Sequence, residues 1–409
     1  SVTASQDSTT FGDEGAIMMD TLSVTLTAAG EGSADATIYY TLDATEVDVP
    51  AGSEATAQEV RGYTFTPEAV TAQWAASGHG MILDEPWRHW DEDGAVPGRC
   101  AKCHSAEGFL QYAATAGNAD PAALPLGLEC SACHSGPMGE TTWSDLTTYP
   151  ALEDVLFPSG ATQDLGGNSN MCITCHQGRE SGVDVDEDIA KCPVDNPMCD
   201  ADCTPMAGAG GSGGASGCEG LGFLNIHYYA AGATFFGTDV QGGYEYDSQT
   251  YVGQNTYPAH PGGLYNDCIE CHMEGNTHLF VPAITSCNGG GCHAPATTFP
   301  TLAGKPSVSY DNIQALLPAL LTAIENYATG TLGEPITYNE DRYPYWFNSS
   351  DESYRFDATL LKGAYNYQTG LKDPGGYIHN GDYIQQILSD SIVDLGGTLP
   401  PGFTRPPTP

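Results

Sequence analysis

Four Cys-x-x-Cys-His pentapeptides and one longer Cys-x4-Cys-His segment constrain this sequence more than any other feature. Their cysteines and histidines are Cys100, Cys103 and His104; Cys130, Cys133 and His134; Cys172, Cys175 and His176; Cys268, Cys271 and His272; and Cys287, Cys292 and His293. With 14 Cys and 11 His in 409 residues, chance predicts on the order of 0.01 such pentapeptides. The pattern is that of covalent c-type haem attachment, in which two thiols bond the porphyrin and the adjacent histidine binds the iron.

Other uses of paired cysteines explain the pattern less well. A zinc ribbon also contains Cys-x-x-Cys pairs, but it needs no histidine directly after every second cysteine. A redox-active dithiol is expected once, beside a βαβ pattern, and not as a series. In the longer fifth motif, Gly289, Gly290 and Gly291 can bulge outward without steric cost and keep the thiols at the required spacing. We therefore predict five covalently bound haem c groups.

The composition agrees with a chain that surrounds cofactors. Its 50 Gly and 27 Pro suit short helices and loops better than a sheet-dominated enzyme. The fold class we predict is a mostly irregular and α-helical multihaem cytochrome c fold wrapped around a haem chain, with a small N-terminal β element and a helical C-terminal region. The sequence contains no run of eighteen apolar residues, so no membrane span is expected. We expect that a secretion signal has been removed.

The chain is strongly acidic, with 12 Lys and Arg against 52 Asp and Glu and a formal net charge of −40. Such a charge excludes nucleic acid as a partner. It indicates the solvated surface of an extracellular protein, and it also suits docking to cationic partners or positively charged minerals. The acidic runs 184–188 and 91–93 lack the spaced ligands of a calcium loop, so calcium is a weak alternative to solvated charge there.

The haem motifs suggest three parts of the chain. Residues 1–60 contain β-forming runs at Leu22–Thr27 and Ala36–Leu42, which predict a small β-hairpin or β-arm. Residues 61–300 contain all five motifs and form the haem-binding region. Residues 301–409 contain none and form a helical region with a Pro-rich tail.

Apolar spacing predicts three helices in the last part. They are expected at 312–327, 358–368 and 382–395, because apolar residues recur there at helical intervals. Pro and Gly near 373–376 are expected to separate the last two helices. The tail from Pro400 is expected to be extended or wrapped over a neighbour.

Four cysteines outside the haem motifs lie close together in residues 191–220. They are Cys192, Cys199, Cys203 and Cys218. An even number of clustered cysteines in a secreted protein predicts two disulfides, here in an inserted loop whose three possible pairings stay open. Metal binding is the alternative, and it is weakened because no histidine falls inside the cluster.

Six histidines remain outside the motifs, and five irons need sixth ligands. In our order of preference they are His79, His227 and His379, then His278, and last His260 and His89. Histidine on both faces gives a low-spin iron closed to substrate, which is chemistry for carrying electrons. His278 lies six residues after His272, too close for an easy return to the same iron, so we expect it to bind another.

Several further segments resemble the secreted, outer-surface multihaem cytochromes of metal-reducing bacteria and archaea. They are Ser77–His79, Arg88–Gly94, Phe157–Gly160, Met171–Glu180, His227–Gly237, Asn266–Met273, Gly363–Gln368 and Tyr377–Tyr383. Some members of this group polymerise into extracellular filaments, or nanowires, with a continuous haem stack, in which a subunit can donate a distal histidine to its neighbour. The resemblance implies an extracellular electron-transfer homopolymer, not an enzyme, that passes electrons to other cytochromes, mineral oxides or electrodes.

Two alternatives stay open from the sequence. A monomeric periplasmic or cell-surface electron shuttle shares every haem argument and differs only in assembly. A multihaem reductase of a nitrogen or sulfur oxyanion needs an iron with an open position. It is less favoured, because the spare histidines suffice to close all five irons.

Overall fold

The computed structural model describes residues 2–5, 25–28, 67–115, 119–125, 127–135, 147–148, 152–166, 168–191, 220–256, 267–288, 293 and 296–408. Their packing divides the chain into two compact units. The first unit is Ser1–Thr147 with Gly275–Val281, and the second is Thr148–Glu274 with Pro282–Pro409. The three-part division suggested by the haem motifs stays a prediction.

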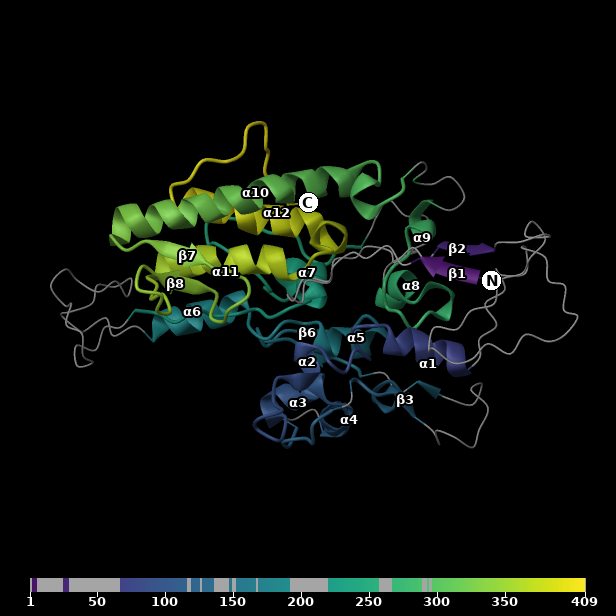
Figure 1. Ribbon diagram of the computed structural model, residues 1–409. Coiled ribbons are helices and arrows are strands. Elements are labelled where there is room, and N and C mark those ends of the chain that lie inside the picture. The colour runs from purple at the N-terminus through teal and green to yellow at the C-terminus, as the bar shows by residue number, and fades with distance from the viewer. Residues whose placement is uncertain are drawn as a thin grey trace, which may run out of the picture. The chain divides into compact units, whose positions relative to one another are not determined.

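The first unit contains short helices and small pairs of strands (Figure 1). Its elements are β1 (Val2–Ser5), β2 (Thr25–Ala28), α1 (Pro67–Ala75), α2 (Glu85–Arg88), α3 (Gly98–His104), α4 (Ala106–Thr115), the 3₁₀ turn η3 (Cys130–Ala132), β3 (His134–Ser135) and β4 (Thr147–Thr148). Strands β1 and β2 pair antiparallel, with Val2 opposite Ala28. A small β element is therefore present near the N-terminus, but it pairs the end of the predicted run 22–27 with a strand, Val2–Ser5, that was not predicted. The second predicted β run, 36–42, lies outside the described residues.

The second unit is mainly helical. Its elements are β5 (Val155–Leu156), β6 (Thr162–Gln163), α5 (Ser169–Cys175), α6 (Gly182–Ala190), α7 (Ala231–Phe236), η5 (Gly237–Asp239), α8 (Cys268–His272), α9 (Ile284–Asn288), η9 (Phe299–Thr301), α10 (Lys305–Tyr327), η10 (Ala328–Leu332), β7 (Ile336–Tyr338), β8 (Trp346–Asn348), α11 (Ala358–Lys372) and α12 (Gly376–Asp394). The turn η7 (Glu274–Asn276) follows α8 in the chain. None of the described helices is long and apolar enough to cross a membrane.

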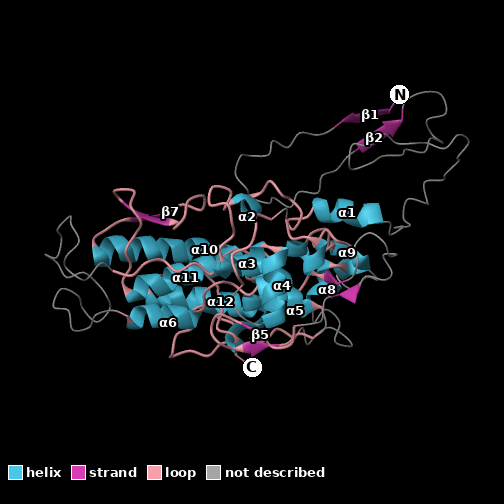
Figure 2. Cartoon of the chain, turned by 90° about the horizontal axis from the view of Figure 1, so that it is seen from below, coloured by secondary structure: helices cyan, strands magenta, loops and turns pink. Residues whose placement is uncertain are grey.

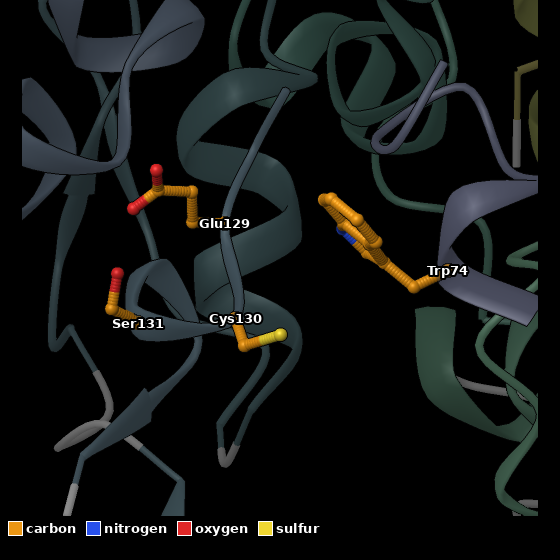
Figure 3. Close-up of a pocket in the computed structure, with 4 residues that line it drawn as sticks. All are labelled: Trp74, Glu129, Cys130 and Ser131. Atoms are coloured by element: carbon orange, nitrogen blue, oxygen red, sulfur yellow. The ribbon is translucent and has the colours of Figure 1, made fainter. Parts of the chain in front are cut away.

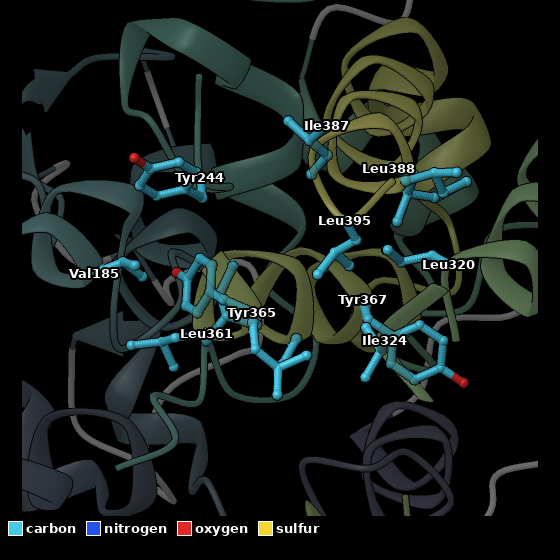
Figure 4. Close-up of a cluster of buried hydrophobic side chains, with 14 of the residues drawn as sticks. Val185, Tyr244, Leu320, Ile324, Leu361, Tyr365, Tyr367, Ile387, Leu388 and Leu395 are labelled. Atoms are coloured by element: carbon cyan, nitrogen blue, oxygen red, sulfur yellow. The ribbon is translucent and has the colours of Figure 1, made fainter. Parts of the chain in front are cut away.

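The core of the second unit lies among α10, α11 and α12, which run side by side in both views (Figures 1 and 2). Helix α10 presents Ile313, Leu316, Leu320 and Ile324 at helical spacing, and all four are buried. Aliphatic and tyrosine side chains of α11 and α12 pack against this face (Figure 4). Full burial of one such side chain stabilises the fold by roughly 1.5–3 kcal/mol.

The three helices predicted at the C-terminal end are confirmed. The predicted spans fall within α10 and α11 and almost entirely within α12, and the predicted break is present between Lys372 and Gly376. Helix α12 is interrupted at Asn380, whose φ of −164° and ψ of 74° are not helical. The Asn380 side chain accepts a hydrogen bond from the Tyr383 amide at 3.3 Å. This cap explains why the helical periodicity in the sequence begins near Asp382.

The Pro-rich tail makes a turn at Pro401–Gly402 and then continues without helix or strand to residue 408, and it packs on α12 of its own chain. Arg405 forms an ion pair with Asp390, with Nε 2.8 Å from Oδ1, and the two side chains are 24% and 9% exposed. Its Nη2 atom donates to the Thr250 carbonyl at 2.9 Å. Gln386 donates through Nε2 to the Pro406 carbonyl at 3.0 Å.

Replacing Arg405 with alanine is expected to lower the free energy of unfolding by about 2–3 kcal/mol, because the substitution leaves a nearly buried carboxylate without its cation. Denaturant unfolding of the purified protein measures the change. Lys305→Ala is the matched control, since Lys305 pairs with Asp382 but is 71% exposed and is expected to contribute less than about 1 kcal/mol. Equal effects of the two substitutions would contradict a tail held by the Arg405 pair.

Candidate haem-binding sites

Two motif histidines are oriented by backbone carbonyls. His104, at the end of α3, places Nδ1 3.0 Å from the Pro86 carbonyl. His176, directly after α5, places Nδ1 2.9 Å from the Tyr229 carbonyl. A carbonyl only accepts, so each Nδ1 donates and each Nε2 keeps the lone pair that a metal needs. Burial lowers the pKa of both histidines, which favours the neutral, metal-binding form.

Tryptophans fix the position of His104 further. The rings of Trp87 and Trp90 meet its imidazole edge-on, with ring centres 6.1 and 5.1 Å away. Trp87 donates through Nε1 to the Gly78 carbonyl at 3.0 Å, and Trp90 is buried with Val96 in a small core of the first unit. Protein contacts alone therefore fix the position of the His104 imidazole.

The histidine of the second motif faces a histidine from outside the motifs. The ring centres of His134 and His278 lie 6.1 Å apart, with an angle of 31° between the ring planes. The His278 Nδ1 atom donates to the Asn276 carbonyl at 3.1 Å, and its backbone amide donates to Gln73 at 3.0 Å. Two imidazoles on opposite sides of one metal ion, with metal–nitrogen bonds of about 2.0–2.1 Å, have ring centres about 6 Å apart. The pair fits two axial ligands of one iron.

A cavity of about 340 Å³ lies beside the first cysteine of the same motif. It is lined by Trp74, Glu129, Cys130 and Ser131. The Cys130 sulfur and the Trp74 ring point into the same space (Figure 3), and Trp74 is fixed by a 2.8 Å hydrogen bond from Nε1 to the Leu128 carbonyl. An apolar ring facing the sulfur suits a flat, apolar macrocycle bonded at that atom.

The histidine of the fourth motif faces a second histidine from outside the motifs. The ring centres of His272, on α8, and His379, on α12, lie 6.1 Å apart with an interplanar angle of 29°. This separation also fits two axial ligands of one metal ion. The His379 backbone is held by Asn255, whose Nδ2 atom donates to the His379 carbonyl at 2.9 Å.

A buried carboxylate orients the His379 ring. The Nδ1 atom of His379 lies 2.9 and 2.8 Å from the two carboxylate oxygens of Asp373. Burial lowers the pKa of His379, but the charge and hydrogen bond of Asp373 outweigh it and raise that pKa above its ordinary value. Burial raises the pKa of Asp373, and His379 reverses this so that the pKa lies below its ordinary value. Asp373 therefore accepts a hydrogen bond from Nδ1 of His379, which leaves Nε2 with the lone pair that a metal needs.

Replacing Gly375 with alanine is expected to weaken iron ligation by His379. A Cβ atom on Gly375 would lie 2.6 Å from His379 Cε1, so the ring must move, although the backbone angles of Gly375 suit alanine (φ −87°, ψ 5°). We expect part of one haem to become high-spin in the electron paramagnetic resonance (EPR) spectrum of the oxidised protein. Gly330→Ala is the control, because a Cβ atom there meets nothing within 4 Å. An unchanged spectrum in Gly375→Ala would contradict the assigned position of His379.

The first cysteines of the third and fourth motifs meet. The Cys268 thiol shares a hydrogen bond with the Cys172 thiol, which lowers the pKa of Cys268. The Cys268 amide also donates to the Ser169 hydroxyl at 3.2 Å. Helices α5 and α8 thus bring two attachment sulfurs from distant parts of the sequence to one place.

The other predicted distal histidines have different surroundings. The centres of the His79 and Phe280 rings lie 4.5 Å apart. The backbone carbonyl of His79 accepts a hydrogen bond from the amide of Leu128, which lies just before the second motif. His227 has a left-handed backbone, with φ of 79°. His89 is 59% exposed and lies 2.6 Å from the Glu85 carboxylate.

Part of the predicted site lies outside the described residues. This holds for Cys292, Gly289, Gly290 and Gly291 of the fifth motif, for His260, and for Cys192, Cys199, Cys203 and Cys218. Cys287 and the eight cysteines of the other motifs are described and partly buried. His293 is described, and its carbonyl accepts from the Ala296 amide at 3.0 Å. The disulfides and the fifth site therefore stay predictions.

The predicted acidic run 184–188 has a structural role. Asp184 closes a capping box with Ser181 at the start of α6, and Asp188 lies 3.1 Å from Lys191. Among the described residues, no group of three or more His, Cys, Asp or Glu side chains is arranged to hold a metal ion.

Comparison with known proteins agrees with the motifs. The chain is 26% identical over 389 residues to the C-type polyheme cytochrome OmcB of Geobacter sulfurreducens, covering 75% of this chain and 45% of OmcB. It is 28% identical over 372 residues to OmcC of the same species, covering 75% of this chain and 44% of OmcC. The resemblance to multihaem c-type cytochromes is confirmed. The chain spans a little less than half the length of these relatives, and neither a protein-family model nor a solved structure matches it.

Sequence reasoning did not assign a role to the residues that orient the candidate ligands. The sequence pattern marks Asp373 and Gly375 only as part of a helix break, yet both lie against His379. The carbonyls of Pro86 and Tyr229 carry no side-chain signal at all. An Asp six residues before a candidate ligand was the only available hint, and such a spacing alone is weak.

Proposed function

We propose that this chain is an electron-transfer protein that binds five haem c groups covalently and coordinates their irons through histidine. The observation that carries the proposal is the two pairs of neighbouring histidines, His134–His278 and His272–His379, each with ring centres 6.1 Å apart. The polyhaem cytochromes among its relatives support it. When bound, such a cofactor supplies a one-electron couple between ferric and ferrous iron.

Different residues are proposed to attach the haems and to bind their irons. The motif cysteines provide the thioether sulfurs, and the motif histidines provide one axial nitrogen each. His278 and His379 are proposed as the distal ligands of the second and fourth sites. His79, His227 and His260 are proposed for the other three, and His89, which is exposed and paired with Glu85, is proposed as the surplus histidine. A hydrogen bond at Nδ1 keeps each oriented ring in the tautomer that binds metal.

The contact between Cys172 and Cys268 supports electron transfer between the third and fourth sites. Haems attached at both sulfurs would have neighbouring edges, because the Cys172 and Cys268 thiols share a hydrogen bond. A short distance between cofactors favours hopping, whereas a catalytic site needs an isolated, open iron. The arrangement therefore favours a conductor over an oxyanion reductase.

EPR spectroscopy of the oxidised protein tests this function. Histidine on both faces of every iron predicts low-spin signals throughout. A substantial high-spin signal in the native protein would contradict the proposal and favour the reductase. Reduction by dithionite and reoxidation by an insoluble ferric oxide then tests whether electrons leave the protein.

The finer proposal is an extracellular, conductive homopolymer. Its support is the acidity of the chain, with a net charge of −40, and the resemblance to cytochromes of which some form filaments. Electron microscopy of native material, together with size-exclusion chromatography, tests it. Filaments of regular repeat are expected, and a species that stays monomeric under all native conditions would replace the polymer by the electron shuttle.

A further inference from the structure

We propose that Asp373 lowers the reduction potential of the fourth haem by acting through His379. Asp373 is thus a positioning and tuning residue that touches no iron itself. The inference rests on the proposed function, because it requires an iron between His272 and His379. It goes further by assigning a specific role to a residue outside the haem-binding motif.

The geometry makes Asp373 a strong acceptor. Both carboxylate oxygens lie within 2.9 Å of His379 Nδ1, and the Asp373 side chain is 3% exposed. The Gly375 amide donates to the same carboxylate at 3.1 Å, and the Thr234 hydroxyl donates as well. These donors keep the carboxylate ionised in a buried place, where water does not screen its charge.

The chemistry follows from the charge of the acceptor. A carboxylate that accepts a hydrogen bond from a ligating imidazole makes that imidazole a more basic ligand. A more basic, more anionic ligand stabilises ferric iron over ferrous iron, and the negative charge itself adds to this preference. The potential of the fourth haem therefore falls.

Four other described histidines have weaker acceptors. His104, His176 and His278 donate to neutral backbone carbonyls. His89 does meet a carboxylate, but that of Glu85 is 77% exposed, where solvent screens the charge. We therefore expect the fourth haem to lie below the third in potential, so that electrons move downhill from the fourth to the third across the Cys172–Cys268 contact.

The experiment compares wild-type protein with Asp373→Asn in a potentiometric titration followed by visible and EPR spectra. The asparagine oxygen can still accept from Nδ1, so the ring keeps its partner while the charge is lost. At a fixed potential, the ratio of reduced to oxidised iron is expected to rise about tenfold at one haem, which is about 59 mV for a one-electron couple. A smaller shift in the same direction is expected at the third haem, because the charge of Asp373 also acts on His176. The remaining couples are expected to stay in place, and Asp373→Glu is expected to restore most of the shift.

The matched control is Asp382→Asn. Asp382 lies three residues after His379 in α12 and pairs with exposed Lys305, so the variant removes the same charge without touching the imidazole. An equal shift in both variants overturns the inference, because it shows a general charge effect. No shift in Asp373→Asn, with all irons still low-spin, overturns the inference alone and leaves the proposed function standing. A wild type without low-spin bis-histidine signals overturns both.

Discussion

Replacing His379 with glycine is expected to turn one haem from low-spin to high-spin, while the number of covalently bound haems stays unchanged. The thioether bonds to Cys268 and Cys271 do not depend on His379, but the sixth ligand does. EPR spectroscopy of the oxidised variant measures the change. Added imidazole is expected to fill the space left by the side chain and to restore the low-spin spectrum.

Two further variants make this result specific. His278→Gly is expected to give a change of the same size at a different haem, because His278 faces His134 and not His272. His89→Gly is expected to give none, because His89 is exposed and paired with Glu85. A His379→Gly protein whose irons all remain low-spin would contradict the assignment of His379 to the fourth site.

Replacing Leu320 with alanine is expected to lower the free energy of unfolding by about 2–5 kcal/mol. Leu320 is fully buried on α10, in the core that supports α12 and therefore His379. Guanidinium unfolding followed by far-ultraviolet circular dichroism measures the loss. The native haem spectrum is expected to stay unchanged, because the ligands themselves are intact.

Val308→Ala is the matched control for Leu320→Ala. Val308 lies on the same helix but is 57% exposed, so its truncation is expected to change stability by less than about 0.5 kcal/mol. Similar small losses in both variants would show that the α10 face is not packed as described.

The sequence predicted what is encoded locally. Each Cys-x-x-Cys-His motif has its functional residues within a five-residue segment, so attachment and proximal ligation can be predicted without knowing the fold. The helices α10, α11 and α12 follow from apolar periodicity. Even the start of the predicted last helix has a physical cause, since Asn380 caps the segment that follows it.

The pairing of histidines was not predictable in the same way. His134 and His278 are far apart in the sequence, and only the packing of the first unit places them 6.1 Å apart. The expectation that His278 serves a haem other than that of His272 followed from the short sequence separation alone, and it stays a prediction. The sequence did not indicate which haem His278 would serve, because that depends on how the chain folds.

The groups that orient the candidate ligand histidines were still harder to predict from the sequence. Asp373 lies in a segment whose Pro and Gly residues dominate any local pattern, so its contact with His379 was hidden. The tail offers a second case. Its prolines predicted an extended chain, but the pairing of Arg405 with Asp390 depends on α12 already being in place.

The mass of the intact protein under denaturing conditions tests the central claim most directly. Covalent attachment at all five motifs predicts one species, heavier by five haems than its polypeptide alone. A mass equal to that of the bare polypeptide, from a colourless sample purified from its native source, would contradict the whole account.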